Sequence, residues 1–182
     1  MVTSWGTKVE KLAVSCGAES IPRKENVSAN GKKFDVKKEK DGKKYYIQVK
    51  SGLNTMNVGM VESLNEMIEK IEEKDSKNVG LLGMTFGNKK AISTQIMDNL
   101  INADEKIIIG NDFWDFISEK YNMSEELLNI VSKAAYNYQI KHKEKKISDL
   151  IDIKKEELLV QWENTYGGIN KESLKKAEDV NL

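Results

Sequence analysis

Residues 34–50 read FDVKKEKDGKKYYIQVK, and this stretch predicts a β-hairpin. An Asp-Gly pair stands between two runs of strand-forming pattern, which is a strong signal for a tight turn. We expect the two strands over residues 33–38 and 44–51, joined by a turn at residues 40–42.

The second strand of this hairpin carries polar residues at positions otherwise suited to burial. Side chains alternate in direction along a strand, so Tyr46, Gln48 and Lys50 share one face. The other face carries Tyr45, Ile47 and Val49. A buried, unpaired lysine is costly and rare. The polar face is therefore either solvated or has a chemical task.

Helices and further strands are expected on both sides of the hairpin. A first helix, capped by Thr3 or Ser4, ends near Ser15, and a long helix capped by Asn57 runs to about Lys74. Before the hairpin the pattern predicts a polar loop over 23–31, and after the long helix it predicts a strand over 77–86, a short helix over 92–101 and a strand over 105–110. A helix over 113–121, capped by Asn111 or Asp112, follows. Further helices run from a cap at Ser124 to about Trp162, and a short amphipathic piece comes after Gly167-Gly168. This order predicts an α/β fold, with a mixed central sheet flanked by helices and a helical C-terminal half.

The length of 182 residues suits one domain, with a core over about residues 3–120 and a helical region over about 121–182. Basic and acidic residues number 29 each, so the net charge indicates no polyanionic partner. Residues 23–50 are nevertheless rich in lysine, whereas residues 61–75 are acidic. A segregated basic surface is typical of proteins that bind polyanions, although a charge run is also often only a solvated face.

Several functional classes are excluded by the composition. Cys16 is the only cysteine, which rules out an internal disulfide framework, and His142 is the only histidine, which rules out a histidine-cluster metal site. No stretch approaches ~20 consecutive apolar residues, so no membrane partner is expected. The N-terminal residues lack the apolar core of a signal peptide, so we expect a reducing, cytoplasmic setting.

The polar residues of the hairpin form a chemically complementary set. Twelve residues separate Asp35 from Gln48, so folding back at the turn lets Asp35, Gln48 and Lys50 meet across the strand pair. A carboxylate, an amide oxygen and the backbone carbonyl of Val49 are hard ligands that suit Mg²⁺. A nearby lysine can stabilise charge on a phosphate or help to deprotonate a water. The hairpin therefore predicts a metal and phosphate site.

This arrangement resembles the PD-(D/E)XK nuclease superfamily. Its motif is an Asp at the start of a hairpin strand, then a carboxylate or amide, any residue and Lys on the next strand, and here it is Asp35 with Gln48-Val49-Lys50. The resemblance implies that Asp35 is the principal metal ligand, Gln48 the second ligand and Lys50 the catalytic lysine. Glu10 stands where the first helix of the family often carries a glutamate, which implies an outer or second-metal ligand.

Three further stretches resemble small type II restriction endonucleases, and with the motif they cover most of residues 3–120. They are SWGTKVEKLA at 4–13, QVKSGLNTMN at 48–57 and EKIIIGNDFWDFISEK at 105–120. The resemblance implies a restriction-endonuclease-like α/β core. Two positions depart from the usual motif: Phe34 replaces a Pro, and Gln48 replaces an acid and so removes one negative charge.

Two loops are predicted to lie along bound DNA, because each follows a strand of the expected core. The candidate DNA contacts are Ser51, Asn54, Thr55 and Asn57 in the first loop, and Thr85, Asn88, Lys89 and Lys90 in the second. These residue types are also common in turns and helix caps, so a purely structural role is the alternative.

The predicted function is that of a type II restriction endonuclease, which hydrolyses double-stranded DNA at specific sites with Mg²⁺, or Mn²⁺ in its place, and leaves 5′-phosphates. Palindromic sites usually demand a two-fold dimer, so we expect a homodimer, with the helices over 124–162 available for dimerisation or DNA wrapping. Two alternatives stay open: a repair or junction-resolving nuclease of the same fold, and a DNA-binding module whose site has lost activity. Because the first helix is expected from about residue 3, specificity elements are expected in the loops or in a partner chain.

Overall fold

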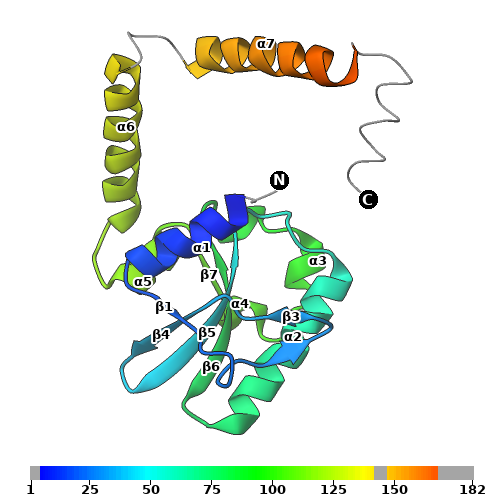
Figure 1. Ribbon diagram of the computed structural model, residues 1–182. Coiled ribbons are helices and arrows are strands. Elements are labelled where there is room, and N and C mark those ends of the chain that lie inside the picture. Colours follow the sequence, from blue (N-terminus) through cyan, green and yellow to red (C-terminus); the bar gives the residue numbers. More distant parts are fainter. Residues whose placement is uncertain (1–4, 142–146, 168–182) are drawn as a thin grey trace. The chain divides into compact units, whose positions relative to one another are not determined.

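The computed structural model describes residues 5–141 and 147–167 (Figure 1). The chain divides into two compact units, Met1–Leu127 and Leu128–Leu182, and the first holds the whole five-stranded sheet. The division falls close to residue 120, where the predicted core ends. That the chain acts as one domain stays a prediction.

The first unit is built around a mixed sheet with the strand order β1-β4-β5-β6-β7. The strands are β1 (Glu19–Ser20), β4 (Val36–Lys40), β5 (Lys43–Lys50), β6 (Asn78–Met84) and β7 (Ile107–Ile109). β4 runs antiparallel to β1 and β5, whereas β5, β6 and β7 are parallel. Lys50 pairs with Met84, and Met84 with Ile109, so the carboxyl ends of the three parallel strands lie level at one end of the sheet.

The predicted hairpin is confirmed as β4 and β5, and its turn is Asp41-Gly42. Both turn residues have left-handed backbone angles, with φ of 50° and 73°, as a type I′ turn requires. The first strand begins at Val36 and not at residue 33, because Lys32–Lys33 form a separate strand, β3, which pairs with β2 (Ser28–Ala29). The loop predicted over 23–31 was therefore wrong in part, since its polar composition concealed this small second hairpin.

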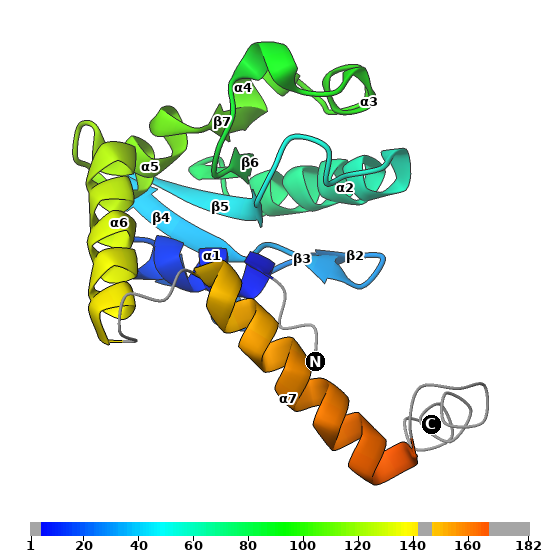
Figure 2. The same cartoon turned by 90° about the horizontal axis from the view of Figure 1, so that it is seen from above.

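Helices cover both faces of the sheet (Figure 2). α2 (Val58–Lys74) packs Leu64 and Ile68 into one core cluster together with Tyr46 of β5. α1 (Trp5–Ser15) and α5 (Asn111–Ser118) cover the other face, where they pack against Ile47 and Val49. The predicted alternation of side chains along β5 is therefore confirmed, and Gln48 and Lys50 belong to the α2 side of the strand.

The two glycines of β6 allow helices to approach the strand closely on both faces. A Cβ added to Gly80 would lie 2.7 Å from Ile68 Cγ1 of α2. A Cβ added to Gly83 would lie 2.5 Å from Phe113 Cε2 of α5. Any larger residue would push the helices away from the sheet, because close-packed interiors have no room for added methyl groups.

The segment between β6 and α5 differs from its prediction. The helix expected over 92–101 is reduced to one turn, α3 (Thr94–Met97), which follows a 3-10 turn, η1 (Lys89–Ala91). A further short helix, α4 (Ala103–Lys106), takes the first residues of the strand predicted over 105–110. α5 has Gly110 as its cap and ends at Ser118, three residues early, because Glu119 adopts a left-handed conformation.

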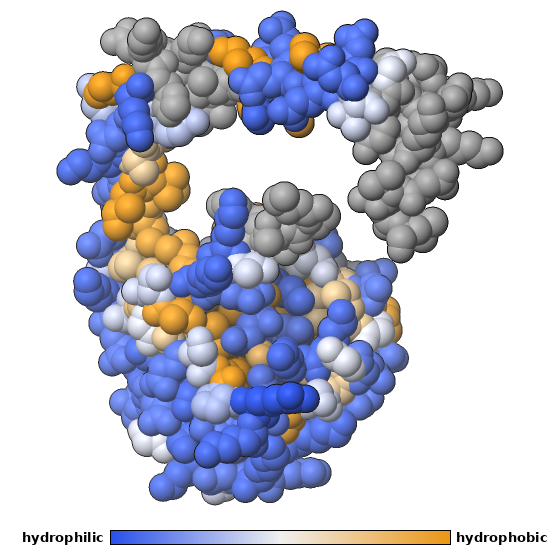
Figure 3. Space-filling model, viewed as in Figure 1, coloured by the Kyte–Doolittle hydropathy of each residue, from blue (hydrophilic) through white to orange (hydrophobic). Residues whose placement is uncertain are grey.

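The C-terminal helices are α6 (Met123–Lys141) and α7 (Ile147–Tyr166). α6 begins at Met123, so the prediction that Ser124 caps it was wrong; the Ser124 hydroxyl instead donates to Asn111 Oδ1 at 2.6 Å. Both helices expose apolar side chains. Those of α6 form an orange strip along that helix in Figure 3. The exposed apolar side chains include Leu128, Ile130, Val131, Tyr136 and Ile140 on α6, and Ile151, Leu158, Leu159 and Val160 on α7. The predicted caps Thr3 and Ser4, His142 and the piece after Gly167 lie outside the described residues.

Candidate active site

Asp35 is held against β5 by two hydrogen bonds. Its backbone N–H donates to the Ile47 carbonyl at 3.0 Å, one residue before Val36 pairs with Ile47 in the sheet. Its carboxylate Oδ2 accepts a hydrogen bond from the Val49 N–H at 2.7 Å. The two contacts fall on either side of Gln48, so Asp35 lies opposite that residue, as the hairpin predicted.

Gln48 and Lys50 are both available to bind a ligand. Gln48 is only 6 % exposed, yet its carboxamide makes no hydrogen bond to any described residue. Among the described residues, Ser93 Oγ is the only fully buried side-chain polar atom without a hydrogen-bond partner. The polar end of Gln48 therefore still reaches solvent, where a ligand can bind it. Lys50 is partly exposed, and its ammonium has neither a hydrogen bond nor an ion pair within the described part of the chain.

Glu10 and Asp35 line the same cleft, which has a volume of about 450 Å³. α1 contributes Glu10 and four further residues to this cleft, and the hairpin side contributes Asp35 and Val36. Glu10 makes no ion pair with a described residue. α1 therefore places a second, unneutralised carboxylate beside Asp35, as the resemblance predicted from the sequence.

The electrostatics of Asp35 reflect this crowding. Its pKa is raised from 3.8 to about 6, mainly by burial and to a smaller extent by the negative charge of Glu10. The N–H of Val49 and the ammonium groups of Lys50 and Lys33 act in the opposite direction. Two carboxylates in a partly dry cleft, one of them difficult to ionise, are typical of sites that bind a cation.

The donor atoms at the end of the hairpin fit a hard divalent cation. Asp35 and Glu10 supply carboxylate oxygens, and Gln48 supplies an amide oxygen. The N–H and C=O of a strand residue point to the same side, so the carbonyl of Val49 faces the edge where Asp35 lies. No cluster of three or more His, Cys, Asp or Glu side chains occurs among the described residues. This agrees with the donor set, because only two of its four members are of those types.

In the loop after β5, two of the candidate DNA-binding side chains form hydrogen bonds with the protein's own backbone. Thr55 Oγ1 donates to the Gly52 carbonyl at 2.9 Å, and Asn57 Oδ1 caps α2 by accepting from the Met60 N–H at 3.0 Å. The side chains of Ser51 and Asn54 form no hydrogen bond with a described residue. Of the four candidates, Ser51 and Asn54 are therefore the ones free to bind DNA.

The loop after β6 lines an open cleft of about 620 Å³ near the same end of the sheet. Its lining residues are Gly87, Asn88, Lys89, Lys90, Ile109, Asn111 and Asp112. Thr85 is buried and acts structurally: its N–H donates to the Lys50 carbonyl at 3.0 Å, and its carbonyl accepts from Trp114 Nε1 at 2.8 Å. Asn88, Lys89 and Lys90 line the cleft, although Lys89 Nζ also donates to the Asp104 carbonyl at 2.7 Å.

Three residues near these sites were not predicted from the sequence. Lys33 acts electrostatically on Asp35, and its place two residues before Asp35 was the available signal. Asn111 and Asp112 line the cleft with Lys89 and Lys90, but in the sequence they were interpreted only as candidate caps of a helix.

The order of helix, antiparallel hairpin, helix and parallel strands defines a restriction-endonuclease-like α/β protein. The family model of the type II restriction endonuclease EcoO109I matches residues 3–139, so the chain belongs to that family of PD-(D/E)XK-type nucleases. The match confirms the resemblance inferred from the sequence, and it extends past the predicted core into α6. No curated protein matched the chain. Among the described residues, no helix is both long and apolar enough to cross a membrane.

The raised pKa of Asp35 predicts how Asp35→Asn changes stability with pH in the presence of a chelator. Above pH 6 the folded protein holds a poorly solvated carboxylate that the variant lacks. We expect the variant to have a free energy of unfolding higher by up to about 3 kcal/mol at pH 8. The gain should shrink as the pH falls from 6 to 4, because the folded parent then takes up a proton before the unfolded chain does.

Urea denaturation at several pH values measures this difference, and Asp41→Asn in the exposed hairpin turn is the control. The control should show no comparable dependence on pH. A variant Asp35→Asn that is no more stable than the parent at pH 8 would show that the Asp35 carboxylate is not destabilised in the fold.

Proposed function

We propose that the protein hydrolyses phosphodiester bonds of double-stranded DNA at specific sequences, with Mg²⁺ as cofactor and with 5′-phosphates on the products. The family supplies the endonuclease class. The observation that carries the finer proposal is the position of Gln48, which lies between the two contacts that hold Asp35. Its carboxamide reaches solvent and has no hydrogen bond to a described residue. A ligand that brings electropositive charge to this point would satisfy Gln48, Asp35 and Glu10 together.

The residues of the site have distinct roles in the proposal. Asp35, Gln48, the Val49 carbonyl and Glu10 would hold the cation, which when bound supplies positive charge at the phosphate and lowers the pKa of water; Mn²⁺ would substitute for Mg²⁺. Lys50 is the group that acts on the reacting phosphate. Its Nζ, which has no partner among the described residues, donates hydrogen bonds to a phosphate oxygen whose negative charge grows during attack by water.

Because Gln48 stands in place of an acid, metal binding depends more strongly on the carboxylate of Glu10. The side chains that would hold the cation bring two negative charges, one from Asp35 and one from Glu10, since Gln48 is neutral. Loss of Glu10 would leave a single carboxylate. Glu10 is therefore as necessary for metal binding as Asp35, although it comes from a different element.

The DNA would pass along the end of the sheet where the parallel strands finish. Lys50 ends β5 there, and the cleft formed by the loop after β6 lies near the same end. Ser51, Asn54, Asn88, Lys89 and Lys90 are the residues that we assign to DNA contact, whereas Thr55, Asn57 and Thr85 support the loops that carry them. A restriction enzyme acts where its DNA substrate is, so we expect the protein in the cytoplasm.

We expect the active form to be a two-fold homodimer, since a palindromic site presents the same contacts twice. The apolar side chains exposed on α6 and α7 are the candidate interface, because contiguous exposed apolar surface usually marks an interaction site. Sedimentation equilibrium should give about twice the monomer mass of 20.7 kDa. Val131→Glu in α6 should shift the equilibrium towards monomer, whereas Lys133→Glu on the same helix should not. A monomer at all concentrations, with or without DNA, would remove the dimer from the proposal.

The nuclease activity itself is tested by incubating plasmid DNA with Mg²⁺. The parent chain should give discrete fragments whose ends can be ligated only if they carry 5′-phosphates. Asp35→Ala and Lys50→Ala should each lower the cleavage rate by at least about 10²-fold, the cost typical of losing one group that stabilises transition-state charge. Lys43→Ala, at the far end of β5, is the control and should cleave like the parent.

Other outcomes of this experiment would favour the alternatives. Cleavage of branched DNA alone would indicate a junction-resolving enzyme of the same fold. If the plasmid stays intact with every divalent metal while DNA binding is retained, the proposal that the protein is a nuclease is contradicted. The protein would then be a DNA-binding module whose site has lost activity.

A further inference from the structure

A third cleft, with a volume of about 430 Å³, is formed by residues that precede Asp35 in the chain. It is formed by the loop before β3 and is lined by Arg23, Asn26, Lys33 and four uncharged residues. Its lining contains two basic side chains and no acidic one. Arg23 is the only arginine of the chain, and arginine is the side chain best suited to bind phosphate through two parallel hydrogen bonds.

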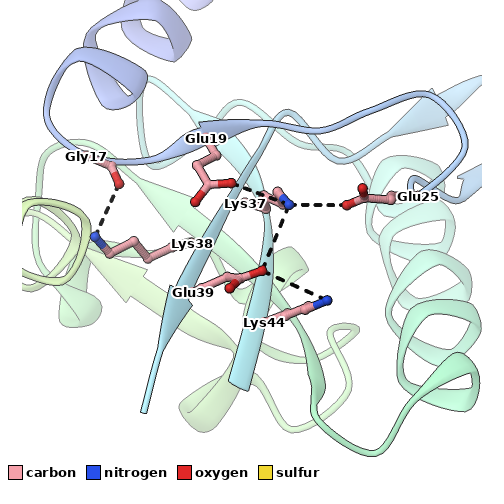
Figure 4. Close-up of polar contacts among 7 residues, drawn as sticks. All are labelled: Gly17, Glu19, Glu25, Lys37, Lys38, Glu39 and Lys44. Carbon is pink, nitrogen blue, oxygen red and sulfur yellow. Dashed lines mark hydrogen bonds and ion pairs between the residues drawn. The ribbon is translucent and has the colours of Figure 1, made fainter. Parts of the chain in front are cut away.

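Two acids that flank this loop in the sequence, Glu19 and Glu25, are engaged in ion pairs with a lysine outside the cleft. Lys37, a buried residue of β4, forms ion pairs with Glu25 at 3.2 Å and with Glu19 at 3.4 Å (Figure 4). Glu25 stands two residues after Arg23, so without Lys37 it would offset the charge of the cleft. Neither Arg23 nor Lys33 forms an ion pair within the described residues. Both basic side chains of the cleft are therefore free of direct ion pairs, although Lys33 also lies within electrostatic range of Asp35.

The loop that forms the cleft is rigidly joined to the active-site hairpin. The Pro22 carbonyl accepts a hydrogen bond from the Glu25 N–H at 2.9 Å, which closes a turn around Arg23. The Asn26 side chain bonds both backbone groups of Phe34, donating to its carbonyl at 2.8 Å and accepting from its N–H at 3.3 Å. Phe34 directly precedes Asp35. The position of the cleft is thus fixed relative to the candidate metal ligand.

We infer that this cleft binds a backbone phosphate of the DNA close to the bond that is cut, with Arg23 and Lys33 as its ligands. The inference rests on the proposed function, because it takes double-stranded DNA as the substrate. Lys33 stands two residues before Asp35, and Asn26 of the cleft is bonded to Phe34, the residue next to Asp35. We therefore place the bound phosphate close to the scissile one along the strand. The contact is made to the sugar-phosphate backbone, and it sets the register of the DNA over Asp35 and Lys50 without reading bases.

The test compares two double variants that each remove two positive charges. Arg23→Gln with Lys33→Gln removes the cleft cations, and Lys43→Gln with Lys77→Gln removes two exposed lysines from the far end of the parallel strands. Binding of a labelled duplex is measured by fluorescence anisotropy over a series of KCl concentrations without divalent metal. A third variant, Arg23→Lys with Lys33→Arg, keeps the charges and checks that the loop folds.

The cleft variant should bind about 10- to 100-fold more weakly at moderate salt. Its plot of log affinity against log salt should be shallower by roughly one to two, since each lost phosphate contact removes about 0.9 from the slope. The control variant should stay within about twofold of the parent, and the charge-keeping variant should recover most of the affinity. Equal losses in the cleft and control variants, or parent-like binding by the cleft variant, would overturn the inference.

Cleavage separates failure of the inference from failure of the proposed function. If the parent cuts DNA and the cleft variant cuts as fast as the control variant, the inference alone is overturned. If the parent neither binds nor cuts duplex DNA, both fail together. Once the cut site is mapped, a single neutral methylphosphonate is placed in turn at each phosphate beside the cut. At one position it should slow cleavage by the parent but not cleavage by the cleft variant. If no position has this effect, the assignment is contradicted.

Discussion

Two hydrogen bonds between Asp35 and β5 organise the candidate site. The backbone N–H of Asp35 reaches the Ile47 carbonyl, and its carboxylate receives the Val49 N–H at 2.7 Å. Because β5 lies in the middle of the sheet, between β4 and β6, its position is set by pairing on both sides. A carboxylate tied to this strand has little freedom, and every other donor of the proposed site is placed by reference to it. The proposed chemistry depends on this geometry.

The same geometry places polar groups where burial makes them costly. The pKa of Asp35 is raised mainly by burial, and Gln48 is only 6 % exposed. A sheet selected for stability alone would carry apolar residues at these positions, because moving polar groups out of water costs free energy. The surrounding packing offsets the cost, with the core clusters of α2 on one face and of α1 and α5 on the other. Strain of this kind at a functional site is expected to be relieved by the ligand.

Much of this site could be predicted from the sequence because its residues are local to one hairpin. The Asp-Gly turn and the alternation of β5 placed Asp35, Gln48 and Lys50 together, and the resemblance added Glu10 from a distant helix. The elements that the sequence pattern did not predict are all short. β2, β3 and α4 each have two to four residues and little periodic pattern, so tertiary contacts and not local preference determine them. For the same reason the basic cleft of Arg23 and Lys33 was visible only as part of a lysine-rich run. Its charge depends on Lys37 drawing Glu19 and Glu25 away, a contact between separate segments.

A Mn²⁺ titration followed by electron paramagnetic resonance tests whether the carboxamide of Gln48 serves as a metal ligand. The comparison is between the parent and Gln48→Leu, which keeps the volume and burial of the side chain but removes its oxygen. We expect the variant to bind Mn²⁺ at least about 10-fold more weakly than the parent. Without metal, its free energy of unfolding should be equal to or above that of the parent. A variant Gln48→Leu that binds Mn²⁺ as tightly as the parent would contradict the claim, and the residue would then be a buried polar group with no role in holding the metal.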